Sequence, residues 1–148
     1  MTVDEWTELQ NFGVDEKDAF GRPITAKIEV INPELMARLD WVVTYAKQEF
    51  GPGNGAFIVN CITLGAHSHG SQHYLGRAVD GYFKGLTLYE MVMLGFKAGF
   101  TGIGYYLDWN IPGVHLDIRE NGVATWLRDY EYFYDFTYFT GRLLDRSA

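Results

Sequence analysis

The chain has 148 residues, a length typical of one domain with a single buried core. Hydrophobic residues make up 47% of the sequence and aromatic residues 16%, which excludes an intrinsically disordered chain. The net charge of −7 excludes the basic face of a nucleic-acid-binding protein, and no apolar run approaches the roughly 20 residues of a membrane-spanning helix. The one cysteine, Cys61, excludes an internal disulfide, and its apolar neighbours favour a role in core packing.

The first 31 residues are mixed in character and show helical spacing at only three aromatic or aliphatic positions. The acidic N-terminus lacks the apolar segment of a secretory signal peptide, so we expect synthesis in the cytoplasm. A helix is predicted to begin after Asn32, because Asn32 can cap it and Pro33 suits its first turn. Its apolar stripe ends by Phe50, before a glycine-rich turn.

Short apolar runs rich in β-branched and aromatic residues predict strands in the middle of the chain. Thr87 and Glu90 form a capping box, which predicts a second helix that continues to about Ala98. The predicted strands cover residues 56–63, 78–83, 100–107 and 114–118, with a polar, glycine-containing loop over 64–72. We therefore expect an α+β fold: a small antiparallel sheet with helices packed on one side.

The C-terminal stretch is rich in aromatic residues, which alternate from residue 130 to residue 138 as in a strand, although some also fit a helix face. Three roles remain open for it: an element that covers the core, a subunit interface, or a platform for sugar rings. The sequence shows no internal repeat and no linker. We therefore treat residues 1–126 as the domain and residues 127–148 as an aromatic-rich extension of the same domain.

A histidine and an aspartate lie seven residues apart in the stretch that runs from residue 71 to residue 80. The predicted strand over 78–83 would hold Asp80 rigidly, and Gly76 would let the chain fold back so that His73 and Asp80 face one point. One imidazole and one carboxylate are two of the three protein ligands that a catalytic zinc site requires. A structural His73–Asp80 pair is the simpler alternative.

The third ligand must come from elsewhere, and His115 is the distant candidate. Strand periodicity puts His115 and Asp117 on one face, with apolar residues on the other, which suits the floor of a site. A core histidine hydrogen-bonded to a carbonyl is the alternative. His73, Asp80 and His115 are thus predicted to hold one ion, zinc or another divalent metal.

The motif Ser-x-His-x-x-Gly-x-Ala-x-Asp, followed by a strand with His-x-Asp-x-Arg, resembles the zinc D-Ala-D-Ala carboxypeptidase family (peptidase family M15). The short form, with the hedgehog-type metallopeptidase fold, is the most similar, and the resemblance covers about residues 4–126. The matching positions are Ser71, His73, Gly76, Ala78, Asp80, His115, Asp117 and Arg119. The resemblance implies a zinc metallopeptidase that hydrolyses an amide bond in the peptidoglycan stem peptide, as a carboxypeptidase or as a phage-type endolysin.

In the family, water activated at the metal attacks the amide, and a carboxylate passes the proton to the leaving amine. Many relatives place an acidic residue three positions before the last histidine ligand, where this chain has Pro112. Asp117 is our first candidate for the catalytic base and Asp108 the second. Asp117 could instead orient the ligand histidine.

Short members of the family carry an arginine after the central strand that is thought to bind the substrate's carboxylate. This chain has Leu64-Gly65-Ala66-His67 there, so a histidine of the loop, or an arginine elsewhere, would supply that charge. The candidate substrate-binding residues are His67, His69, Ser71, Arg77 and Arg119. His67 and His69 also resemble a small metal clip.

Two other functions fit the same residues. One is a catalytically inactive homologue that keeps the metal site in a cell-wall-binding or virion structural role. The other is a metal-stabilised interaction module, which a homo-oligomer assembled through residues 127–148 would favour. If the protein acts on the cell wall, the apparent lack of a signal peptide favours phage-type release or a virion-borne enzyme.

Overall fold

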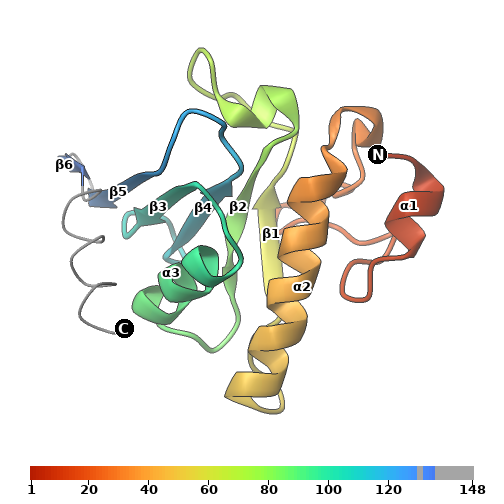
Figure 1. Cartoon of the computed structure of the whole chain (residues 1–148), viewed down its shortest axis with the longest axis horizontal. Coiled ribbons are helices and arrows are strands. Elements are labelled where there is room, and N and C mark those ends of the chain that lie inside the picture. Colours follow the sequence, from red (N-terminus) through yellow and green to blue (C-terminus); the bar gives the residue numbers. More distant parts are fainter. Residues whose placement is uncertain (130–131, 136–148) are drawn as a thin grey trace.

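The computed structural model describes residues 1–129 and 132–135, and it has the α+β fold that the sequence predicts (Figure 1). One sheet of six strands is covered on one face by two helices, and a shorter helical segment lies at the N-terminus. The helices are α1 (Val3–Thr7), α2 (Pro33–Phe50) and α3 (Leu88–Lys97), with 3₁₀ turns η1 (Ile28–Val30) and η2 (Gln72–Leu75). The strands are β1 (Phe57–Cys61), β2 (Ala78–Phe83), β3 (Gly102–Tyr106), β4 (Gly113–Asp117), β5 (Ala124–Asp129) and β6 (Tyr132–Asp135).

The strand order is β1-β2-β4-β3-β5-β6, and every neighbouring pair is antiparallel except β3 and β5, which are parallel. The four strands predicted from the sequence pair antiparallel, as expected, and the one parallel pair involves β5, which was not among them. Both edges of β4 are occupied, by β2 and β3, so β5 joins the free edge of β3. β3 runs opposite to β4, and so does β5. β3 and β5 therefore run in the same direction and pair in parallel.

The C-terminal extension begins inside a strand, because β5 continues across residues 126 and 127. β6 then pairs with β5 from Tyr132 to Asp135, in line with the strand-like alternation of that stretch. The rest of the extension lies outside the described residues. Its role as a cover, an interface or a sugar platform stays a prediction.

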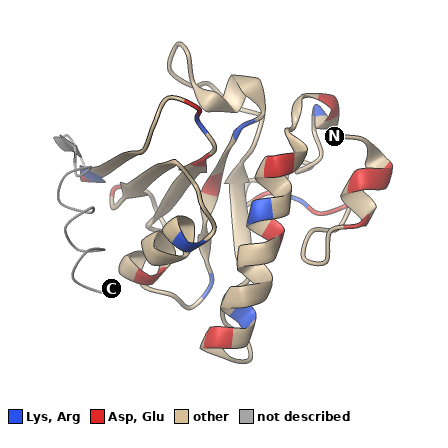
Figure 2. Cartoon of the chain, viewed as in Figure 1, with Lys and Arg blue, Asp and Glu red and all other residues tan. Residues whose placement is uncertain are grey.

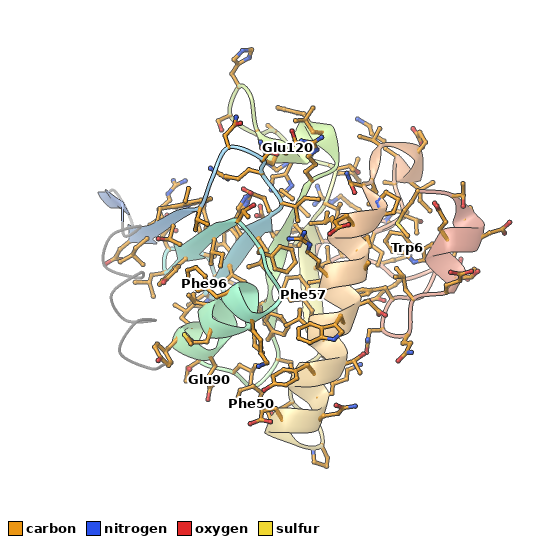
Figure 3. The ribbon with its side chains drawn as sticks, viewed as in Figure 1. Trp6, Phe50, Phe57, Glu90, Phe96 and Glu120 are labelled. Carbon is orange, nitrogen blue, oxygen red and sulfur yellow. The ribbon has the colours of Figure 1, made fainter. Side chains whose placement is uncertain are left out.

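Helix α2 begins where the sequence indicates, because the Asn32 side chain accepts a hydrogen bond from the backbone N–H of Glu34. In α3 the capping box forms in full, between Thr87 and Glu90. The glycine inside this helix, Gly95, allows close packing on the sheet: a Cβ there would lie 2.9 Å from Leu116. Apolar residues of both helices and of the covered sheet face form one buried cluster, in which Phe57 lies near α2 (Figure 3).

Residues 1–31 pack beside α2 and the outer edge of β1. Trp6 is fully buried, and its indole N–H donates to the Phe12 carbonyl at 3.1 Å (Figure 3). The backbone N–H of Ala19 donates to the Val59 carbonyl at 2.7 Å, so the N-terminal segment protects part of an edge strand.

Acidic positions are spread along α1 and α2 (Figure 2). No helix within the described part of the chain has the length and apolarity that crossing a bilayer requires.

Candidate metal centre

The site lies on the sheet face opposite α2 and α3, along one row of residues that crosses the strands. Asp80 of β2 is the register partner of His115 of β4, which is in turn the partner of Gly104 of β3. Gly104 pairs with Trp126 of β5, and on the other side Asp80 is the partner of Cys61 at the end of β1. Residues in register share a face of the sheet, so the row brings these side chains together.

Gly104 leaves room for the site's aromatic wall. A Cβ at this position would lie 2.4 Å from the Trp126 indole, so the indole occupies the space that a side chain would take. The indole ring consequently comes to 5.2 Å from the His115 ring, centroid to centroid. The site is thus bounded by β5, the strand added in parallel.

His73 reaches the row from η2, in the connection between β1 and β2 that projects beyond the sheet (Figure 1). Ser71 caps η2 by accepting from the His73 backbone N–H, and Gly76 ends it with a positive φ of 63°. A Cβ on Gly76 would lie 2.0 Å from the Val30 carbonyl oxygen. Gly76 therefore lets the chain turn back between His73 and Asp80, as the sequence indicates.

One oxygen of Asp80 faces a nitrogen from each of two histidine rings. Oδ1 of Asp80 lies 3.2 Å from Nε2 of His73 and 2.8 Å from Nδ1 of His115. His73 is only 2% exposed, and its Nε2 has no aligned hydrogen-bond partner among the described residues. The three side chains can offer ligand atoms that all lie within 4.8 Å of one another.

The second nitrogen of each ring is held by an acceptor, and this decides the tautomer. Nδ1 of His73 lies 2.7 Å from the Ile62 carbonyl oxygen, so Nδ1 carries the proton in the neutral ring. Nε2 of His115 lies 2.9 Å from the Asp117 carboxylate and likewise carries the proton. The remaining nitrogens, Nε2 of His73 and Nδ1 of His115, then present lone pairs toward the same Asp80 oxygen.

Three lone-pair-bearing atoms around one point repel one another unless a cation lies between them. Without a metal, protons take that role. Burial lowers the pKa of His73 and of His115, but the neighbouring carboxylates outweigh burial and raise each pKa to about 9. Burial raises the pKa of Asp80, but its two histidine neighbours outweigh this and hold the pKa well below its usual range. Two nitrogens and one carboxylate suit zinc and other divalent metals, so the donor set fits a metal ion.

Asp117 lies beneath His115 and is fully buried. Besides His115, its carboxylate accepts from the backbone N–H of Arg119 at 3.0 Å and from that residue's guanidinium, with Nε at 2.9 Å. Burial raises the pKa of Asp117, but its contacts with Arg119 and His115 outweigh burial and hold the pKa well below its usual range. Asp117 therefore remains ionised and fixes the orientation of His115.

A cleft of about 540 Å³ opens over the predicted ligands. Its walls include the aromatic rings of Tyr106 and Trp109, which stack with centroids 4.4 Å apart, and the indole of Trp126. A second hollow of about 420 Å³ meets the first at His67, Asp80 and Trp109, which line both. A ligand could therefore extend on both sides of the proposed ion.

Of the two candidate bases, neither lines this cleft. Asp117 is covered by His115, as described above. Asp108 lies 3.0 Å from Nε of Arg128, and only Arg128 of this pair reaches the cleft wall. Among the residues that the structure describes, Asp80 is the one carboxylate in the lining.

The predicted substrate-binding residues are only partly brought together. His67, His69, Ser71 and Arg119 line the cleft, whereas Arg77 does not and pairs with Glu120 at 3.0 Å. Arg119 is held by Asp117, with its guanidinium carbon 5.1 Å from the centre of the Trp126 ring.

His67 stacks on His73, with ring centroids 4.0 Å apart and an interplanar angle of 9°. Its Nε2 lies 3.1 Å from the Leu64 carbonyl oxygen and 3.4 Å from Sγ of Cys61. Burial, together with nearby His73, lowers the pKa of His67. Neither group of three or more possible metal ligands found among the described residues contains His69, whereas His67 joins Cys61 and His73 in a second such group.

Sequence reasoning missed Cys61, Tyr106, Trp109 and Trp126 as residues of the site. Cys61 is buried, as predicted, but it lies beside the histidines because a register shift between Val59 and Cys61 aligns it with Asp80. The position of Cys61 at the end of the strand that leads into the loop with His67 was the available signal.

Comparison of the chain with known proteins gave no match to a family model, a curated protein or a solved structure.

Proposed function

We propose that this chain is a zinc-dependent hydrolase that cleaves an amide bond in the peptidoglycan stem peptide. One observation carries the metal site: Nε2 of His73 and Nδ1 of His115 both face one oxygen of Asp80, while acceptors hold their other nitrogens. This is the ligand set of a catalytic zinc site, which has three protein ligands and an open position. The resemblance of the motifs to the D-Ala-D-Ala carboxypeptidase family supports the substrate class.

Bound zinc would supply a Lewis acid that polarises the amide carbonyl and makes water more acidic. Groups of the chain itself would hold the two histidine rings in place. The Ile62 carbonyl and Asp117 keep His73 and His115 in the tautomers that expose a lone pair to the ion. Asp117 is thus a positioning residue, not the base.

His67 is our candidate for the proton acceptor. It lines the cleft, and its lowered pKa keeps the ring neutral at pH 7. Because Nε2 faces the Leu64 carbonyl, Nδ1 is the basic nitrogen of the neutral ring. His69 lies on the same loop but is exposed, and it provides a matched control for metal binding.

The cleft walls favour an anionic peptide. Arg119 and Arg128 line the cleft, and the Arg128 side chain is 54% exposed despite its contact with Asp108. Guanidinium groups bind carboxylates through paired hydrogen bonds, and stem peptides carry carboxylates. The aromatic rings of Trp109 and Trp126 offer flat apolar surfaces beside these charges. Action on the cell wall is part of this proposal.

The test is release of new amino groups from purified peptidoglycan by the native, untagged protein. We expect zinc-dependent release, loss of release with a chelator, and recovery on adding zinc. His115→Ala should abolish release and weaken zinc binding, whereas His69→Ala should leave zinc binding unchanged. Active protein that holds no divalent metal and resists chelators would overturn the proposal.

A second candidate is a metal-binding homologue without hydrolytic activity. The absence of a carboxylate other than Asp80 from the cleft lining, within the described ranges, favours it. Pro112, which stands where relatives carry an acidic residue, favours it too. Stoichiometric zinc binding combined with no release of amino groups from any peptidoglycan tested would select this candidate.

A further inference from the structure

A second set of metal ligands adjoins the first and shares one residue with it. Cys61, His67 and His73 can each offer a ligand atom, all within 4.8 Å of one another. Sγ of Cys61 lies 3.4 Å from Nε2 of His67, and the His67 ring stacks on the ring of His73. Cys61 comes from β1, whereas both histidines come from the loop and 3₁₀ turn that follow it.

His73, the residue that both sets share, has only one nitrogen available to bind a metal. Nδ1 of His73 is held by the Ile62 carbonyl, so only the buried Nε2, which lacks an aligned partner in the described structure, is free to bind a cation. One nitrogen lone pair binds one ion. The set of Cys61 and His67 therefore competes with the set of Asp80 and His115 for His73.

The two sets differ in chemical character. Asp80 contributes a hard carboxylate oxygen, whereas Cys61 contributes a soft sulfur. In the metal-free protein the Cys61 thiol contacts the Leu64 carbonyl, a weak interaction. Binding through Cys61 forms a sulfur–metal bond and releases the thiol proton to solvent. The proton on Nε2 of His67, which faces the Leu64 carbonyl, moves to Nδ1, so that Nε2 offers its lone pair to the metal. No oxidation or reduction takes place.

We propose that Cys61, His67 and His73 form a second binding position for a soft divalent cation, which excludes simultaneous use of His73 by the first position. A thiophilic metal such as Cd²⁺ binds through Cys61, and a harder one is held with Asp80 and His115. The proposal concerns binding alone and does not depend on hydrolysis.

The experiment titrates the metal-free, full-length protein with Cd²⁺ and records the ultraviolet absorption of thiolate-to-cadmium charge transfer. We expect the band to appear and to saturate at one equivalent. Cys61→Ser should abolish the band, and His67→Ala should weaken the affinity measured through it. His69→Ala is the control and should leave both unchanged. Circular dichroism of each variant checks that it is folded.

A second variant tests the competition for His73. His115→Ala breaks the first set, so this protein titrated with Co²⁺ should show a thiolate-to-cobalt band stronger than that of the wild type. Adding Cys61→Ser to His115→Ala should remove it. Cadmium binding with no thiolate band in the wild type, or bands that persist in Cys61→Ser, would overturn the proposal. Failure of the first site alone would instead appear as weak Zn²⁺ binding in Cys61→Ser with the cadmium band of the wild type intact.

Discussion

His115 lies between two carboxylates, and each one acts on a different nitrogen. Asp117 holds Nε2 from below, so Nδ1 is left to face Asp80. Because Asp117 is buried and bound by Arg119, its charge is maintained when the cleft above it opens or fills. We therefore expect Asp117 to affect the metal affinity of the proposed site and not proton transfer.

Asp117→Asn should weaken zinc binding by about 10–100-fold, the usual effect of removing an outer partner of a ligand histidine. The neutral amide stabilises the required tautomer less, and Arg119 loses its ion pair. Asp108→Asn is the control, because Asp108 contacts Arg128 outside the cleft and should leave zinc affinity unchanged. Competition with a chromophoric chelator measures the zinc affinity of both variants. Unchanged zinc affinity with lost hydrolysis in Asp117→Asn would show that this residue is the base after all.

The three predicted ligands could be found from the sequence because local patterns place them. Strand alternation puts His115 on a polar face, and Gly76 predicts the reversal between His73 and Asp80. Cys61 could not be placed in this way, since its position depends on a register shift in the β1–β2 pairing. A single-residue shift is set by pairing between strands, which no local pattern records.

At the scale of elements, η2 is fixed by the glycine that ends it. Gly76 has a positive φ, and its Cα faces the backbone of Val30, just before α2. The turn that carries His73 therefore packs against the start of a helix, supported by the N–H of Asn32 donating to the Gly76 carbonyl at 2.9 Å. The loop that follows β1 is anchored at this point.

Gly76→Ala should lower the free energy of unfolding by more than Gly70→Ala does. Both glycines have a positive φ, which costs an alanine about 1–2 kcal/mol. A Cβ at Gly70 meets no atom within 4 Å, whereas one at Gly76 would lie 2.0 Å from the Val30 oxygen. The difference between the variants, measured by urea unfolding, isolates the packing of η2. Equal losses would contradict this packing.

The positions of the helices and strands along the chain could be predicted from the sequence more closely than their arrangement in the sheet. Caps at Asn32 and Thr87 located both long helices, because capping is a local interaction. The parallel pairing of β5 with β3 was not predicted from the sequence. It arises because both edges of β4 are already occupied, which is a property of the assembled sheet. The position of Trp126 beside the site depends on this parallel pairing.

At the scale of the whole molecule, protons and the proposed metal ion would compete for the same buried position. In the metal-free protein His73 and His115 have pKa values raised to about 9, against an ordinary value of 6.5. Their protonated forms therefore stabilise the fold fully below about pH 6.5, and this contribution is lost as the pH rises through about 9. Metal binding needs the neutral rings, so it strengthens over the same range.

We expect the Tm of the metal-free protein to fall between about pH 6.5 and 9. The difference in Tm between zinc-loaded and metal-free protein should widen over this interval. Differential scanning calorimetry of both forms measures the effect, and the double variant Cys61→Ser, His115→Ala is the control that should show no zinc-dependent difference. A zinc effect that shrinks as the pH rises would contradict the assignment of these two histidines.

The pairing of Asp80 with His115 across β2 and β4 joins segments 35 residues apart in the chain. A slip of one residue in that alignment would turn one of the two side chains to the helix-covered face and separate it from the other. The pair of Asp80 and His115 therefore exists only after the two strands have met in the correct alignment. An ion that binds there cannot guide the strands together, but it locks them once they have met, so its contribution would appear in slower unfolding and not in faster folding.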